Sequence, residues 1–175
     1  NRLRAHVVRT LAAAGVAAVA PLLLPQWREA RSDGCGQAST WSERHAAFAA
    51  GLGTFGLCDG LITPLGKAMR CGSVVARLRV SPSARPYAER HAYCLFYSDK
   101  RGCGACMRRC PIGAISEAGH DKDACLAYLD KLRTSLLEPV FGVSTNACGL
   151  CQTGVPCEAR IPARLRPRDD GALNR

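Results

Sequence analysis

The chain has 175 residues, with 24 Lys and Arg against 14 Asp and Glu, and so a formal net charge of +10. Hydrophobic residues make up 47% and charged residues 22%, a balance that excludes an intrinsically disordered chain and is sufficient for a packed core. The 11 cysteines are several times the ordinary share, which calls for disulfides or metal ligands as an explanation.

The N-terminal region is expected to form a helix, a glycine turn and a short strand. Apolar residues recur at helical spacing through residues 3–14, Gly15 then ends the helix, and residues 16–19 are typical of a buried strand. The apolar stretch 11–24 follows three arginines and also fits a signal-peptide core with a cleavage box at 18–20, but it is too short to cross a bilayer as a helix. We favour the helix and strand, which predict no membrane association, a cytoplasmic protein, and cysteines that bind metal rather than form disulfides.

A polar, glycine-rich loop is expected at 31–39, followed by a second helix. Thr40 and Glu43 have the spacing of a capping box, in which each side chain can bond the other residue's backbone N–H. The helix that this box opens should run to Ala50 and be closed by Gly51.

The letters GLGTFG at 51–56 match the dinucleotide-binding pattern GxGxxG, but they follow a predicted helix instead of a strand, which favours a tight turn with close backbone packing. Short strands are predicted at 61–63 and 73–80. Asp121 is expected to cap a further helix that runs to about Arg133.

A linker rich in Pro and Ser at 81–86 divides the chain by composition. We predict an α+β protein in which a small α/β part, residues 1–80, precedes a cysteine-rich part, residues 81–160. Residues 161–175 carry several arginines and few apolar residues, and are expected to form a flexible basic tail.

The cysteine-rich part contains the spacing of an iron–sulfur loop. The letters CGACMRRCP at 103–111 form C-x2-C-x3-C-P, which matches the last three cysteines of the bacterial ferredoxin run. A short loop of this kind wraps a four-iron cube, and the proline turns the chain away so that the last cysteine serves a second cluster. The first cysteine of the run would fall at Lys100, and Cys94 is expected to replace it.

Eight cysteines from Cys94 onward therefore form two sets of four. One cluster is assigned to Cys94, Cys103, Cys106 and Cys157, and the other to Cys110, Cys125, Cys148 and Cys151. Two zinc ions could use the same eight residues, although the run CPIGAI at 110–115 is not typical of zinc sites. The remaining cysteines and the histidines are expected to be packing or surface residues: Cys35, Cys58 and Cys71, and His6, His45, His91 and His120.

Several segments together resemble epoxyqueuosine reductase and its relatives, which include reductive dehalogenases. They are Glu43-Arg44, AGLG at 50–53, LITP at 61–64, the cysteine run, CLAYL at 125–129 and the pair Cys148 and Cys151. The resemblance implies a ferredoxin-like module with two [4Fe-4S] clusters that passes single electrons to cobalamin, which would lie beside Gly51 and Gly53. The alternative for these glycines is packing against the neighbouring strand.

Two departures from the relatives leave the substrate and the catalytic residues unassigned. The acidic residue that donates a proton in the epoxyqueuosine enzymes falls on Gln37, and an amide cannot donate a proton as a carboxylic acid can. Five residues separate Cys151 from Cys157, where the relatives have three followed by Cys-Pro.

Three functions remain as hypotheses. The first is an iron–sulfur oxidoreductase, with an acidic flavodoxin or ferredoxin as electron donor and with tRNA as a substrate that the charge permits. The second is a ferredoxin-like electron carrier without a substrate of its own. The third is a zinc-stabilised RNA-binding protein, which is disfavoured because aromatic residues for base stacking are only 6% of the chain.

Overall fold

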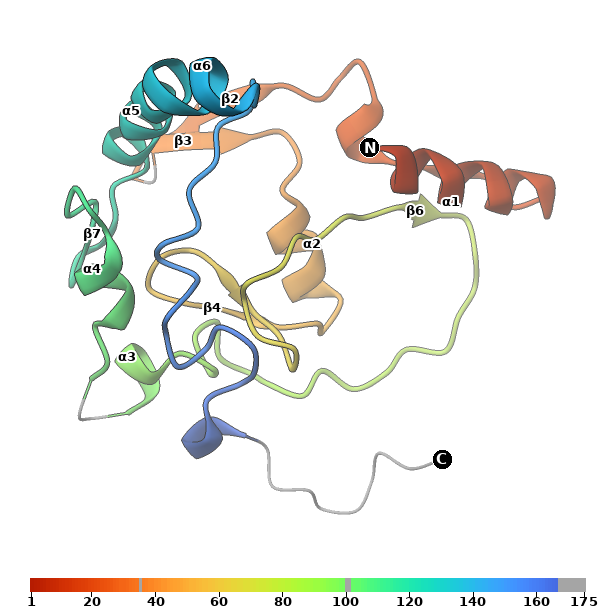
Figure 1. Cartoon of the computed structure of the whole chain (residues 1–175). Coiled ribbons are helices and arrows are strands. Elements are labelled where there is room, and N and C mark those ends of the chain that lie inside the picture. Colours follow the sequence, from red (N-terminus) through yellow and green to blue (C-terminus); the bar gives the residue numbers. More distant parts are fainter. Residues whose placement is uncertain (35, 100–101, 167–175) are drawn as a thin grey trace.

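The computed structural model describes residues 1–34, 36–99 and 102–166 (Figure 1). It combines short helices with small antiparallel sheets, at 33% helix and 13% strand. The predicted α+β class is confirmed at this level. The described residues form four sheets of two strands each, β1 with β6, β2 with β3, β4 with β5, and β7 with β8.

The N-terminal helix and its glycine stop are confirmed. Helix α1 spans Arg2–Ala13, and Gly15 turns the chain with a φ of 75°. Strand β1, Ala18–Val19, pairs with β6, Val75–Ala76, so both predicted strands are cut to two residues. The predicted burial of the first strand is wrong, because the Val19 side chain is 44% exposed. No helix in the described ranges has the length and apolarity to cross a membrane.

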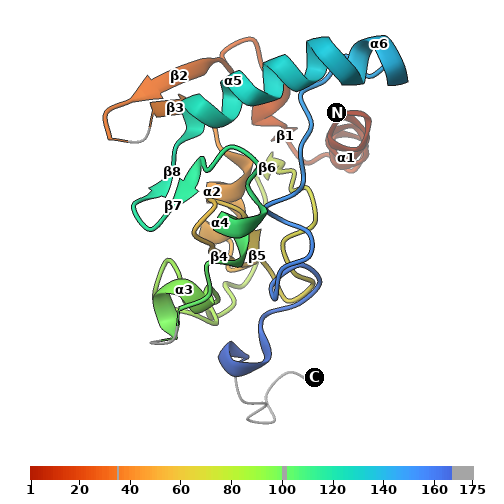
Figure 2. The ribbon, with the colours of Figure 1, turned by 60° about the vertical axis from the view of Figure 1, so that its left-hand side comes forward.

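A β-hairpin replaces the loop expected at 31–39. After the single turn of η1, Pro21–Leu23, strands β2, Glu29–Ser32, and β3, Gly36–Ser39, pair from Glu29–Ser39 to Ser32–Gly36. One side of the hairpin faces solvent and its residues are polar. The sequence therefore lacks the apolar alternation from which strands are predicted. Helix α5 lies across the hairpin (Figure 2), held by a 2.6 Å ion pair between Arg31 and Asp123.

Helix α2, Glu43–Ala49, begins at Ser42, so the predicted capping box at Thr40 is wrong by two residues. The Ser42 hydroxyl accepts the backbone N–H of His45, whereas the Thr40 hydroxyl accepts the backbone N–H of Arg28 across the hairpin base. The Thr40 hydroxyl could cap the helix or bond the backbone beside the hairpin, and it bonds the hairpin. The cap of α2 is therefore supplied by Ser42.

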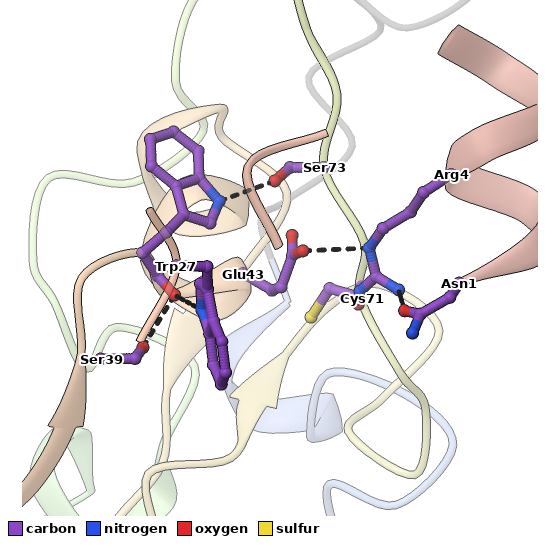
Figure 3. A network of polar contacts seen from close by, with 8 residues as sticks. Asn1, Arg4, Trp27, Ser39, Glu43, Cys71 and Ser73 are labelled. Atoms are coloured by element: carbon purple, nitrogen blue, oxygen red, sulfur yellow. Dashed lines mark hydrogen bonds and ion pairs between the residues drawn. The ribbon is translucent and has the colours of Figure 1, made fainter. Parts of the chain in front are cut away.

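A polar network fastens α1 to the start of α2 (Figure 3). Arg4 pairs with Glu43 at 3.0 Å and also donates to the Cys71 carbonyl at 3.1 Å. The Trp41 carbonyl accepts hydrogen bonds from Trp27 and Ser39 at 3.3 and 2.7 Å. Glu43 thus anchors α1 to α2, while its neighbour Arg44 donates to the Asp59 carbonyl at 2.6 Å.

The main core joins the two predicted parts of the chain. Strands β4, Thr54–Phe55, and β5, Leu61–Ile62, are fully buried. The buried cluster beside them combines residues from before and after the linker, namely Leu57, Cys58, Ile62, Tyr87, Tyr93, Cys94, Cys106, Ile115 and Ile161. The predicted boundary at 81–86 is therefore a change of composition that does not separate two cores.

The elements after the linker are short and separated by the cysteine loops. In chain order they are α3, Leu95–Ser98, α4, Ala105–Arg109, β7, Ile115–Ser116, β8, Gly119–His120, α5, Lys122–Leu132, the π-helical turn η2, Arg133–Leu137, and α6, Glu138–Phe141. The predicted cap of α5 is confirmed, since the Asp121 carboxylate accepts the Ala124 N–H at 2.9 Å.

The start of the predicted tail is packed. Ile161 is 6% exposed within the core, and η3, Ala163–Leu165, follows it. The expected flexible tail at 161–175 is thus wrong for its first residues. Residues 167–175 lie outside the described part of the chain.

Candidate metal centre and adjoining cavity

One cavity, here the Cys94 cavity, is lined by all four cysteines assigned to the first cluster. Cys94 precedes α3, Cys103 and Cys106 come from the loop and first turn of α4, and Cys157 comes from the C-terminal loops. Leu57, Val155 and Pro162 complete an apolar shell around the sulfurs. Cys94, predicted to replace a cysteine at position 100, therefore lies with its three proposed partners.

A second cavity, here the Cys148 cavity, has a volume of about 330 Å³ and is lined by all four cysteines assigned to the second cluster. They are Cys110 after α4, Cys125 on α5, and Cys148 and Cys151 from the loop that follows α6. Each set of four, although spread over at least 40 residues of sequence, thus meets at one cavity.

The two cavities differ in how much open space they hold. The Cys94 cavity encloses about 20 Å³, so a four-iron cube seated there requires its cysteine side chains to move apart. Among the described residues, no group of three or more Cys, His, Asp or Glu side chains is arranged to hold a metal ion. Four cysteines line the Cys94 cavity and six line the Cys148 cavity, because Cys58 and Cys71 also border the latter. Groups of thiols are the ligand chemistry of iron–sulfur and structural zinc sites.

Two contacts hold the cysteine loops against one another. Arg109 on α4 donates to the Leu150 carbonyl at 3.1 Å, which ties the first cysteine run to the loop between Cys148 and Cys151. The backbone N–H of Lys67 donates to the carbonyls of Cys157 and Glu158, both at 2.9 Å. Arg109 thus has a structural role between two of the cysteine loops.

A buried pair between the cavities was missed by the sequence analysis. The Lys67 ammonium lies 3.1 Å from the Cys58 sulfur, and the two residues are 2% and 3% exposed. Lys67 lines both cavities. A fully buried lysine is rare unless an anion compensates it. The prediction that Cys58 is only a small apolar residue is therefore wrong. The sequence feature that could have indicated the pair is a lysine within an apolar stretch, nine residues after Cys58.

The electrostatics of this pair follow from its surroundings. Hydrogen bonds with the Cys106 and Cys151 side chains, aided by the Lys67 charge, lower the pKa of the Cys58 thiol in spite of its burial. Burial by itself lowers the pKa of Lys67, but the neighbouring sulfurs of Cys58 and Cys157 raise it above its ordinary value. The interior between the two cavities thus favours the Lys67 cation next to a Cys58 thiolate.

The glycines proposed for cobalamin are explained by packing. A Cβ on Gly53 would lie 2.9 Å from the Ile62 carbonyl carbon and nearer still to its oxygen, so only glycine lets β4 approach β5. Gly51 has a φ of +79° and faces Pro86 at 3.7 Å. Tyr87 accepts the Gly53 N–H and donates to the Phe48 carbonyl at 2.6 Å. Packing of the chain explains both glycines, and cobalamin binding stays a prediction.

A third cavity, here the hairpin cavity, lies between the β2–β3 hairpin, α2 and α5, with a volume of about 590 Å³. Gln37, the residue in the position of the relatives' proton donor, lines it, as do His45 and His120. Cys125 borders both this cavity and the Cys148 cavity. Both histidines are predicted to be packing or surface residues, because nothing in their local sequence links them to Cys125.

The other predicted positions are explained more simply. His6 is exposed on α1, and His91 bonds the Phe55 carbonyl at 2.8 Å, as expected of surface and packing residues. Cys71 borders the Cys148 cavity without belonging to either set of four. Cys35 lies outside the described residues.

Comparison of the chain with protein-family models, with curated proteins and with solved structures finds no match in any of the three.

Proposed function

We propose that the protein is an iron–sulfur oxidoreductase that carries single electrons through two [4Fe-4S] clusters. The observation that carries this proposal is the meeting of four cysteines at each of two neighbouring cavities, in the partition that the ferredoxin-type spacing predicts. Each cluster, when bound, would accept and release one electron at a time.

The chain's own residues fit such a role. Cys94, Cys103, Cys106 and Cys157 would hold one cluster, and Cys110, Cys125, Cys148 and Cys151 the other. Lys67, buried between the cavities, would offset the negative charge that thiolate-ligated clusters bring into the interior. The apolar shell around the Cys94 cavity limits contact with water, a factor that sets cluster potentials.

A specific observation favours a reductase over a carrier without a substrate. A pure carrier needs only its clusters and a docking surface, whereas this chain has a cavity of about 590 Å³ that shares Cys125 with the Cys148 cavity. This volume lies in the usual range for small-molecule sites, about 300–1,000 Å³. We propose that the acceptor binds there, and that a flavodoxin or ferredoxin supplies the electrons.

Anaerobic purification with iron, acid-labile sulfide and zinc analysis tests the proposal. Two clusters require about eight iron and eight sulfide per chain. Cys106→Ala should lose one cluster and Cys148→Ala the other, leaving about four iron in each variant. Cys71→Ala is the matched control, because Cys71 borders a cavity but belongs to neither set, and it should keep all eight.

Zinc without sulfide would overturn the proposal and leave the zinc-stabilised alternative. A Cys71→Ala variant that loses iron like Cys148→Ala would show that the partition of ligands is wrong.

A further inference from the structure

We propose that the hairpin cavity binds a small organic oxyanion, a carboxylate or phosphate ester with an apolar body, next to the cluster site at Cys125. The proposal deepens the proposed function and rests on it for the role of Cys125. It concerns binding at the cavity, and three features of the described residues support it.

The first feature is unbalanced positive charge. Arg44, Arg90 and Lys122 line the cavity, against the carboxylates of Glu29 and Asp59. The Asp59 carboxylate is already engaged, at 3.6 Å from the Lys122 ammonium and 3.5 Å from His120 Nδ1. The cavity therefore keeps cationic groups that its own carboxylates do not neutralise.

The two arginines are the groups available to a ligand. Arg44 donates to the backbone carbonyl of Asp59 at 2.6 Å, which orients its guanidinium without cancelling its charge. The Arg90 guanidinium lies 4.9 Å from the centroid of the Phe55 ring. Neither has a carboxylate within 4.0 Å in the described part of the chain. A guanidinium presents a planar fork of donors that suits carboxylate and phosphate oxygens.

The second feature is the response of a histidine to this charge. Burial is the largest cause that lowers the pKa of His45, and the charges of Arg90, Arg44 and Lys122 lower it further. Asp59 acts in the opposite direction and is the weakest of these influences. The field at the cavity wall is therefore positive, as an anion-binding site requires.

The third feature is an apolar wall. Trp27, Phe55, Leu126 and Leu129 line the cavity together with the cationic groups. Small-molecule sites combine apolar walls with a few placed polar groups, and the apolar part adds affinity that a bare inorganic anion cannot gain. A ligand with both an oxyanion and an apolar body uses both parts of the site.

Calorimetry on the anaerobically purified, iron-loaded protein at low ionic strength tests the proposal with benzoate, phenyl phosphate, inorganic phosphate and neutral benzyl alcohol as probes. We expect benzoate or phenyl phosphate to bind at least tenfold more tightly than benzyl alcohol or inorganic phosphate. Arg90→Gln should weaken that binding at least tenfold. Arg85→Gln is the matched control, because Arg85 also lies over an aromatic ring, Phe48 at 5.4 Å, but lines none of the three cavities.

A second variant tests the location. Ala38 lines the cavity from β3, so Ala38→Phe should fill part of the space and abolish binding. Benzyl alcohol binding as tightly as the anions, or both Arg90→Gln and Ala38→Phe binding like the unaltered protein, would overturn the proposal. Two zinc per chain with anion binding intact would instead overturn the cluster assignment and leave the oxyanion site standing.

Discussion

A methyl group added at Gly66 should disturb the backbone that follows Cys157. Gly66 has a φ of +85°, and a Cβ there would lie 2.6 Å from the Ala159 Cα and nearer still to the Glu158 carbonyl. The turn from Thr63 to Gly66 thus rests directly on the backbone that follows Cys157. No side chain can fit between these two backbone segments.

Two costs combine in Gly66→Ala. A left-handed conformation costs an alanine roughly 1–2 kcal/mol. The backbone segments must also separate, and overpacking of this kind costs roughly 1–3 kcal/mol. The total is about 2–5 kcal/mol, and a protein of this size loses roughly 2–4 °C in Tm for each kcal/mol.

Gly142→Ala is the matched control for Gly66→Ala. Gly142 has a φ of +64°, and a Cβ there would have no other atom within 4 Å. Gly142→Ala therefore carries the conformational cost without the steric clash. Thermal unfolding followed by circular dichroism, under anaerobic conditions, should give a Tm for Gly66→Ala several degrees below that of Gly142→Ala. Gly66→Ala should also lose iron, because Glu158 cannot move without Cys157. Equal Tm values and equal iron contents for the two variants would refute the reasoning.

The remaining predictions concern charge. Lys67→Met should lower the equilibrium constant for reducing each cluster at least tenfold, about 59 mV for one electron, because a buried cation no longer stabilises the added charge. Potentiometric titration followed by electron paramagnetic resonance measures this, and equal potentials in Lys67→Met and in Lys131→Met, which alters an exposed lysine of α5, would contradict it. The pKa of His45 lies below its ordinary 6.5, so the unfolded chain takes up this proton first. The stabilisation from neutral His45 should be complete above pH 6.5 and lost as the pH falls below it, a dependence that denaturant unfolding between pH 5.5 and 7.5 should show and that His45→Gln should remove. Arg90→Gln should raise the pKa of His45 in an NMR titration, and an unchanged value would argue against the positive field in the hairpin cavity.

Features that depend on neighbouring residues were predictable from the sequence. The stop of α1 at Gly15 and the cap of α5 at Asp121 follow from backbone preferences that act over a few residues. The proposed partition of the eight cysteines into two sets of four starts from the run at 103–111, where a loop of fixed length presents its thiols in a fixed order.

Features that depend on distant residues were decided by the tertiary structure. The pairing of β2 with β3 occurs beside α5, and Arg31 of β2 contacts Asp123 of α5 across 92 residues of sequence. A separation of 93 residues likewise hides the environment of Cys58, whose sulfur donates to the Cys151 carbonyl at 3.8 Å. The pairing of Cys58 with Lys67 became significant only once folding removed both from water, because an ammonium and a sulfur interact strongly in a low-dielectric interior and weakly in solvent. The sequence by itself predicted which thiols could share a cluster. The packing of the loops decided which charge lies between the two cavities and which open space lies beside Cys125, since both depend on burial that no local pattern encodes.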